Sequence, residues 1–283
     1  MEEGQLEAWG LLLEFISSMS VAAACKLRIP DILARSVGGE GVSGDGLTLQ
    51  ELATAIVRNY ATRKDDNNGN MINADVNKDF LRRLMRFLCR KGVFTLVQHA
   101  PEAEPRYALN HVSRWLLVPS TTTTMSSRSP PTLGPMSFLY ASESCLSSWC
   151  HMADSIVDSE GGSAFQRAHD GATLYEVLSR SDDPFSSRMA STFADALAAE
   201  TDIAISVILE HYVEAGGGFG GATSLVDVGG STGKAAALIA TQCAPRLRVV
   251  NFDLPHVIKQ APPYEGSYSL AHNNLNLHAC HRQ

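Results

Sequence analysis

The stretch Leu225-Val-Asp-Val-Gly-Gly-Ser-Thr-Gly-Lys234 decides the fold of the second half of the chain. Leu225 to Val228 is a short apolar run, typical of a buried parallel strand. The glycines after it open a turn, here called the glycine turn (residues 229–233), into a helical segment that runs to Cys243. A strand, a glycine turn and a helix in this order predict an α/β unit. The free N–H groups at the start of the helix suit a polar or anionic ligand.

A second apolar run, Leu247 to Phe252, ends in Asp253. Asp253 follows Gly233 by about 20 residues, the spacing at which an acidic residue on the next strand hydrogen-bonds ribose hydroxyls. The glycines do not fit the dinucleotide fingerprint G-x-G-x-x-G. The pattern therefore predicts a nucleotide-type pocket of another kind. The alternative is an ordinary βαβ unit whose glycines only make a tight turn.

Composition limits the class of protein. With 283 residues, 45% of them hydrophobic, the chain is long enough for two domains. The formal net charge of −7 lies in residues 119–283, which argues against a general nucleic-acid-binding surface. The six cysteines show no C-x-x-C spacing, and the N-terminus lacks the basic region of a signal peptide. We find no apolar run of bilayer-spanning length and expect a soluble, cytoplasmic protein.

The first part of the chain predicts helices followed by a hairpin. Residues 6–27 have helical apolar spacing on all sides, which suggests a helix between partners. Thr48 and Glu51 form a capping box for the next helix, and residues 59–77 form a polar loop. Residues 78–92 predict an amphipathic helix ended by Gly92, with these side chains inward: Phe80, Leu81, Leu84, Phe87 and Leu88. Residues 93–97 and 107–109 predict two strands, so the whole describes a winged helix.

Two interpretations of this winged helix stay open. One face of the helix at residues 78–92 is basic and would suit the DNA major groove; it carries Arg82, Arg83, Arg86, Arg90 and Lys91. The other interpretation is a solvated basic face on a packing helix. A Ser/Thr/Pro-rich stretch at residues 118–135 predicts the domain boundary. Helical segments follow at these positions: 137–157, 174–179 and 184–213.

Several motifs in one order give the chain a family resemblance: Leu27-Arg-Ile-Pro-Asp-Ile, Phe80-Leu-Arg-Arg-Leu-Met-Arg, Tyr107-Ala-Leu-Asn, Ser148-Trp149, Leu225-Val-Asp-Val-Gly-Gly and Asn251-Phe-Asp-Leu-Pro-His-Val-Ile258. Together they resemble plant S-adenosylmethionine-dependent phenolic O-methyltransferases of the caffeic acid and flavonoid type. The resemblance runs from about residue 6 to about residue 266. Asp227-x-Gly229-x-Ser231-x-Gly233 resembles the family's D-x-G-x-G-x-G turn, with serine at the middle glycine.

The resemblance implies a homodimer. Residues 1–118 would be a mainly α winged-helix dimerisation domain, and residues 119–283 an incomplete α/β Rossmann-like methyltransferase domain. S-adenosylmethionine would donate a methyl group to a phenolic hydroxyl of a small aromatic substrate, with no metal, nucleic acid or membrane involved. Gly229 would lie against the cofactor, with Asp227 supporting the turn. Asp253 would bind the ribose, with Leu254 beside the adenine.

The substrate residues come from the same resemblance. Phe185, Met189 and Phe193 are spaced by four on one predicted helix and would line the aromatic pocket, with Trp149 nearby. The alternative is that these side chains form plain helix core.

One motif of the family, the one that carries its general base, is not found in this sequence. The family's general base is a histidine followed by Asp-Trp, and none of the nine histidines has that context, so we assign no catalytic residue. Residues 267–283 show no strand periodicity and are taken as an unrelated tail; its His278, Cys280 and His281 make only a weak metal pattern. We therefore expect a two-stranded sheet, poor order over residues 220–283 and little activity. The alternative function is a non-catalytic dimer partner of full-length O-methyltransferases.

Overall fold

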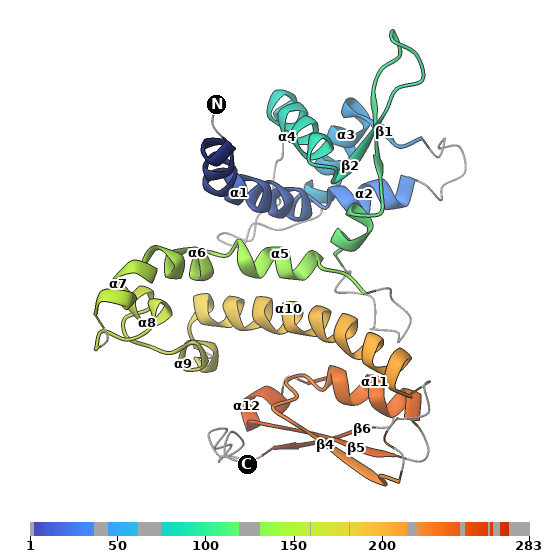
Figure 1. Ribbon diagram of the computed structural model, residues 1–283. Coiled ribbons are helices and arrows are strands. Elements are labelled where there is room, and N and C mark those ends of the chain that lie inside the picture. Colours follow the sequence, from blue (N-terminus) through green and yellow to red (C-terminus); the bar gives the residue numbers. More distant parts are fainter. Residues whose placement is uncertain are drawn as a thin grey trace. The chain divides into compact units, whose positions relative to one another are not determined.

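The computed structural model describes residues 3–36, 45–61, 75–118, 131–158, 160–180, 182–213, 219, 221–243, 247–259, 261–262 and 267–271. The chain forms two compact units, labelled by element in Figure 1. The first is Met1–Thr123 with Thr132–Ser142, and the second is Thr124–Pro131 with Glu143–Gln283. The predicted boundary after residue 118 and most of the predicted polar loop at 59–77 lie outside the described residues, so both stay predictions.

The first unit is mainly helical. Its helices are α1 (Glu3–Lys26), α2 (Ile29–Ser36), α3 (Leu49–Ala61), α4 (Lys78–Arg90) and α5 (Gly134–Tyr140), with a 3-10 turn at Ser113–Leu116. Its strands are β1 (Leu47–Thr48), β2 (Phe94–Val97) and β3 (Arg106–Leu109), in the antiparallel order β1-β3-β2. The predicted helices and hairpin are therefore confirmed.

The core of this unit is built from α2, α3, α4 and the hairpin, and it corrects one prediction. Leu81 and Leu88 of α4 are buried as predicted, and Leu84 and Phe87 are partly buried against the same cluster. Phe80 was predicted to face inward and is instead exposed, while Met85 is fully buried. Phe80 lies in the first turn of α4, where its ring receives the Arg83 guanidinium at 5.7 Å.

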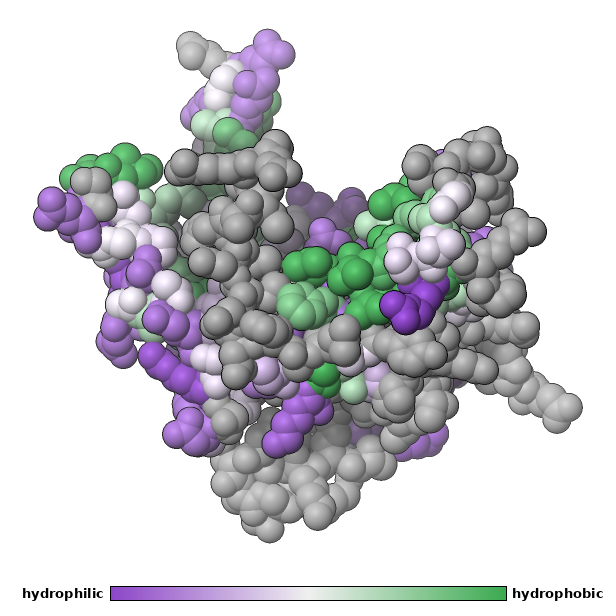
Figure 2. All heavy atoms as spheres, turned by 90° about the horizontal axis from the view of Figure 1, so that it is seen from below, coloured by the Kyte–Doolittle hydropathy of each residue, from purple (hydrophilic) through white to green (hydrophobic). Residues whose placement is uncertain are grey.

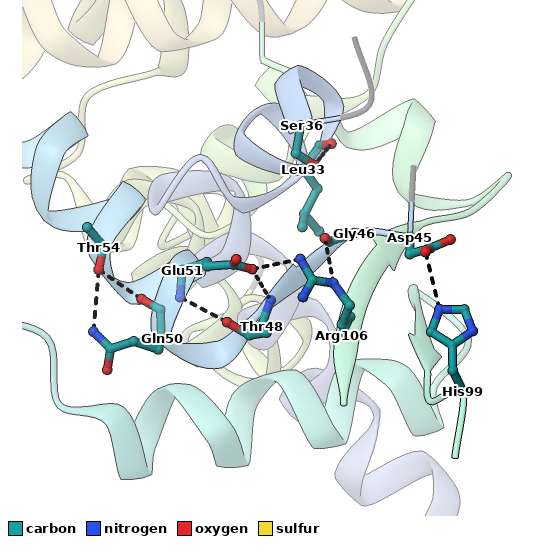
Figure 3. A network of polar contacts seen from close by, with 10 residues as sticks. All are labelled: Leu33, Ser36, Asp45, Gly46, Thr48, Gln50, Glu51, Thr54, His99 and Arg106. Atoms are coloured by element: carbon teal, nitrogen blue, oxygen red, sulfur yellow. Dashed lines mark hydrogen bonds and ion pairs between the residues drawn. The ribbon is translucent and has the colours of Figure 1, made fainter. Parts of the chain in front are cut away.

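A polar network ties the start of α3 to the hairpin (Figure 3). The Thr48 hydroxyl accepts the Glu51 N–H at 3.2 Å, and a Glu51 carboxylate oxygen accepts the Thr48 N–H at 2.8 Å. The predicted capping box is thus confirmed. The same oxygen of Glu51 accepts from the Arg106 guanidinium at 2.9 Å, and Arg106 Nε donates to the Gly46 carbonyl at 3.1 Å. Glu51 therefore serves both the helix cap and a cross-link to β3.

We expect Glu51→Ala to lower the free energy of unfolding of this unit by about 1–2 kcal/mol, because it removes a cap acceptor and the partner of Arg106 together. Urea denaturation followed by circular dichroism measures the change. Glu104→Ala is the matched control, since Glu104 is exposed in the hairpin loop. Equal stability of the two variants would contradict this role for Glu51.

Helix α1 is apolar and largely exposed over its first half. By length and composition α1 could cross a membrane, which corrects the expectation that no apolar run is long enough. Two glutamates, Glu7 and Glu14, interrupt its apolar surface. Only the end of α1 joins the core, through residues such as Ala24 and Cys25. Within the described part of the first unit, the first half of α1 is therefore an exposed apolar surface.

The second unit begins with short helices around a long one. The short helices are α6 (Glu143–Cys150), α7 (Met152–Val157), α8 (Ala164–Ala168) and α9 (Leu174–Ser179); the long one is α10 (Pro184–Ile208), which continues as a π-helical turn at Leu209–Val213. The helix predicted over residues 137–157 is wrong as a single element, because the chain breaks at Ala141 and His151. The segments predicted at 174–179 and from 184 onward are confirmed.

A parallel sheet completes this unit. It has the order β4-β5-β6, with β4 (Ser224–Val228), β5 (Arg248–Asp253) and β6 (Ser267–Ala271). Helix α11 (Lys234–Cys243) follows β4, and the short α12 (Pro255–Ile258) follows β5. The expected two-stranded sheet is wrong: β6 pairs with β5 from Val249↔Ser267 to Asp253↔Ala271. Backbone pairing along β5 places a strand where the side-chain pattern indicated none.

The two faces of this sheet differ. Leu225 and Val249 pack with α11 in one apolar cluster. Val226 and Val228 point to the opposite face, and their side chains are 56% and 50% exposed. Figure 2 shows the molecule from below, and a group of hydrophobic residues is visible on the side that faces the viewer. Within the described part of the chain, α11 therefore covers one face of the sheet, and β4 leaves apolar side chains exposed on the other.

Candidate cofactor site

The candidate site lies where β4 and β5 end side by side. The strands pair in parallel, with Asp227 beside Asn251 and Val228 beside Phe252. The Gly229 N–H continues this pairing and donates to the Phe252 carbonyl at 2.7 Å. Because the carboxyl ends of parallel strands meet at one edge of a sheet, the glycine turn and Asp253 come together there.

The backbone of the glycine turn takes an unusual alternating form. Gly229, Ser231 and Gly233 have φ of +76°, +52° and +84°. Among the described residues, no atom lies within 4 Å of a Cβ added at Gly229, so these residues leave the backbone there open to a ligand. A ligand can therefore approach the main chain at Gly229, as the resemblance implies. The glycine pattern alone did not indicate that the serine shares the left-handed conformation of its neighbours.

Asp253 is buried at the end of β5, and its carboxylate is already oriented by two backbone donors. Oδ2 accepts the Ser231 N–H at 2.7 Å, and Oδ1 accepts the Leu254 N–H at 2.7 Å. Each carboxylate oxygen has a second lone pair, so Asp253 can still accept two hydroxyl donors. Leu254, half-buried, follows directly as the cap of α12. The arrangement suits a vicinal diol such as a ribose.

Asp227 is half-buried beside this carboxylate. Burial raises the pKa of Asp227, and the nearby Asp253 charge raises it further. Its Oδ2 is buried without a hydrogen-bond partner among the described residues. Among the described residues, the side-chain hydrogen bonds that hold the turn come instead from Asn251 and Asp253 on β5. A supporting role for Asp227 in the turn stays a prediction.

The raised pKa of Asp227 gives a pH-dependent expectation. The folded state holds the Asp227 proton more tightly than the unfolded chain does, so ionisation at neutral pH opposes folding. We expect Asp227→Asn to raise the thermal midpoint at pH 7, with the difference shrinking as the pH falls toward the ordinary value of 3.8. Scanning calorimetry across this range measures the difference. Asp182→Asn, at an exposed carboxyl, is the control; a midpoint lowered at pH 7 in the Asp227 variant would contradict the expectation.

The start of α11 is fixed to α10 by a nearly buried ion pair. Lys234 Nζ lies 3.0 Å from Asp202 Oδ1, and their side chains are 11% and 24% exposed. A lysine at a helix N-terminus opposes the helix dipole, and the Asp202 carboxylate offsets that charge. Sequence patterns did not single out this pair, because the two residues lie on different helices. It joins the helix that follows the glycine turn to the helix that carries the candidate substrate residues.

The candidate substrate residues are placed unevenly. Phe185 lies at the start of α10 and is exposed, whereas Met189 is buried in a small cluster with Ala172 and Val177. Phe193, one turn further, is half-buried. Trp149 lies on α6, is 62% exposed and makes no aromatic contact within the described residues. The burial of Met189 agrees with the helix-core alternative, while Phe185 and Trp149 remain accessible to a ligand.

One histidine near these residues was missed by the sequence reasoning. The His169 ring lies 4.1 Å from the Phe165 ring and 6.1 Å from the Phe185 ring, measured between centroids. Its Nε2 lies 3.3 Å from the Ser144 carbonyl oxygen. A carbonyl only accepts, so Nε2 is the donor in this contact. An imidazole beside Phe185 adds a polar group to an aromatic wall.

No cluster of three or more histidine, cysteine or acidic side chains able to hold a metal ion occurs within the described ranges. The oxygen atoms of Asp227 and Asp253 instead lie at a backbone turn with open space at Gly229.

Two family models match the chain. A model described as the O-methyltransferase dimerisation domain matches residues 9–119, and a model described as the O-methyltransferase domain matches residues 149–278. The second match includes β6 and extends into the segment that we took as an unrelated tail. The two models match two parts of the chain in the order that the motifs indicate.

Curated relatives and solved structures agree with these domains. A desmethylxanthohumol 6'-O-methyltransferase of Humulus lupulus is 30% identical over 93% of this chain and 64% of its own length. A probable inactive methyltransferase of Oryza sativa subsp. japonica is 31% identical over 96% of this chain and 64% of its length. The chain therefore spans slightly less than two thirds of these relatives. A structure of human N-acetylserotonin methyltransferase with SAM matches with a TM-score of 0.67 at 17% identity, covering 96% of this chain and 67% of the human one, which shows the shared fold.

Proposed function

Because the chain belongs to the O-methyltransferase family, which joins a dimerisation domain to a methyltransferase domain, we propose that it binds S-adenosylmethionine as a methyl donor for O-methylation. The observation that carries the proposal is the meeting of the open backbone at Gly229 with the oriented carboxylate of Asp253. Gly229 would border the cofactor and Asp253 would accept its ribose hydroxyls. Leu254 would lie beside the adenine, and Asp227 would complete the acidic rim.

The proposed acceptor is a phenolic hydroxyl on a small aromatic of phenylpropanoid or flavonoid type. Two relatives are named as a flavonoid 3'-O-methyltransferase and a caffeic acid 3-O-methyltransferase, and aromatic side chains of this chain would suit such an acceptor. Phe185 and His169 offer ring surfaces beside each other, and Trp149 is accessible on α6. Met189 and Phe193 would support this wall from within α10. Bound S-adenosylmethionine would supply an electrophilic methyl group, and these residues would orient the ring that accepts it.

We assign no described side chain as the base that removes the phenolic proton. A phenol has an ordinary pKa near 10, so most of it stays protonated at neutral pH unless a base assists. We expect the chain to bind the methyl donor with methyl transfer close to background. Incubation of the purified chain with methyl-labelled S-adenosylmethionine and a catechol-type acceptor tests this. Transfer well above a no-enzyme control would contradict the expected inactivity while supporting the proposed reaction.

A second candidate function is a non-catalytic partner in dimers of the family. Two findings favour it: the dimerisation domain is matched over residues 9–119, and one relative is named as probably inactive. The exposed apolar first half of α1 would provide the surface that a partner covers. Co-purification of the tagged chain with a full-length family member tests this function. If the two proteins elute in separate peaks at micromolar concentration, this second candidate function is excluded.

We also propose a cytosolic homodimer that uses neither metal nor nucleic acid nor membrane. The five described cysteines are free thiols, as expected in a reducing compartment. Helix α1 is long enough to cross a membrane, but most of it lies in the segment that matches the dimerisation domain. Its apolar surface therefore favours a protein partner. The acidic second half of the chain supports the view that nucleic acid is not a ligand.

A further inference from the structure

Ser231 is held by two side chains of β5. Its N–H donates to Asp253 Oδ2 at 2.7 Å, and its carbonyl accepts from Asn251 Nδ2 at 3.1 Å. Asn251 and Asp253 are two residues apart on one strand, so they face the same side of the sheet. The N–H and the carbonyl of Ser231 are thus both hydrogen-bonded to side chains of β5.

The conformation of Ser231 explains why it needs holding. Its φ of +52° lies in the left-handed region, as do those of Gly229 and Gly233 on either side. Glycine adopts this conformation freely, whereas a residue with a Cβ does so at an energetic cost. The turn therefore requires a left-handed residue at its middle position, where this chain has serine. Something outside the turn must offset that cost.

Asn251 is the residue placed to do so. Asn251 is fully buried, and its side chain also lies close to residues of the glycine turn other than Ser231. A Cβ added at Gly230 would collide with Asn251 Oδ1 and Asp227 Oδ2, and one at Gly233 would lie 3.0 Å from Asn251 Nδ2. The Asn251 amide therefore packs against three residues of the glycine turn, Gly230, Ser231 and Gly233. Its Oδ1 has no hydrogen-bond partner in the described ranges, so the donated bond to Ser231 is its polar anchor there.

We propose that Asn251 is a positioning residue that, together with Asp253, clamps Ser231 in the left-handed conformation and so gives the glycine turn its cofactor-binding shape. The clamp takes the place of the conformational freedom that a middle glycine would supply. The effect on cofactor affinity rests on the proposed function. The effect on the turn itself does not, because the hydrogen bonds form without a ligand.

A double-mutant cycle of Asn251→Ala and Ser231→Gly tests the clamp with two measurements. The first is the hydrogen-exchange rate of the residue 231 amide in the ligand-free full chain, measured by NMR. The second is the affinity for S-adenosylhomocysteine, measured by titration calorimetry. Because Asn251→Ala leaves the same cavity in both backgrounds, a difference between backgrounds isolates its action on the left-handed residue. The exchange of the Val250 amide, within the β4–β5 ladder, controls for opening of the sheet.

We expect Asn251→Ala to speed exchange at residue 231 and to weaken binding, each by about ten-fold, in the otherwise native chain. In the Ser231→Gly background both effects should fall to about three-fold or less, because glycine needs no clamp. Equal effects in the two backgrounds, or equal acceleration at Val250, would overturn the proposal. If the native chain binds no S-adenosylhomocysteine, the proposed function fails, and the exchange rates alone still decide whether the clamp exists.

Discussion

Asp253→Ala is expected to weaken S-adenosylhomocysteine binding by at least about 100-fold, or about 3 kcal/mol, because two hydroxyl donors would lose a charged acceptor. The carboxylate is buried and oriented by the N–H groups of Ser231 and Leu254. Such preorganisation means that no side-chain freedom is lost when a ribose binds. The variant also removes one half of the clamp on Ser231, which adds to the loss.

Two further variants make this prediction specific. Asp253→Asn keeps the shape and one carbonyl acceptor, so its loss should be smaller than that of Asp253→Ala. Asp182→Ala removes an exposed carboxylate of the same unit and should leave the affinity unchanged. Calorimetric titration of all three proteins gives the comparison. An Asp253→Ala protein that binds as tightly as the native chain would show that the ribose is held elsewhere.

Leu12→Glu is expected to convert a dimer to a monomer. Leu11, Leu12 and Phe15 on α1 are 72%, 68% and 64% exposed in the single chain. Side chains three and four apart lie on one face of a helix, so Leu12 and Phe15 form a continuous apolar surface. If the second subunit covers this face of α1, a glutamate there is buried at a cost of several kcal/mol. This cost raises the dimer dissociation constant by about 100-fold or more.

Sedimentation equilibrium at micromolar concentration measures this effect. Gln50→Glu introduces the same side chain at an exposed site on α3 and serves as the control. The native chain and the control should sediment as dimers and Leu12→Glu as a monomer. A Leu12→Glu protein that remains dimeric would place the subunit interface away from this face of α1.

Much of the fold could be predicted from local patterns. The capping box at Thr48 and Glu51, the end of α4 at Gly92 and the hairpin that follows depend on residues close in sequence, and all are present. Long-range effects were harder to predict. Phe80 has the spacing of an inward residue but lies beside the buried stripe of Leu81, Met85 and Leu88, and it is exposed. β6 forms because β5 offers a free backbone edge, which no side-chain period reveals.

The candidate site shows the same division. The glycine turn and Asp253 were predicted from their spacing, and the structure brings them together at the ends of β4 and β5. Whether they bind a cofactor stays a prediction. Asn251 was missed because it looked like one more residue of an apolar strand. An asparagine inside an apolar strand, two positions before the acidic residue, was the available signal, since an amide on a buried strand needs a partner.

Titration calorimetry of the purified full chain with S-adenosylhomocysteine tests the central claim most directly, because it asks whether the Gly229 and Asp253 site binds the methyl-donor nucleoside without requiring catalysis. We predict saturable binding with one site per chain and a dissociation constant well below about 1 mM. An absence of saturable heat up to that concentration, from protein whose circular dichroism shows it to be folded, would contradict the account.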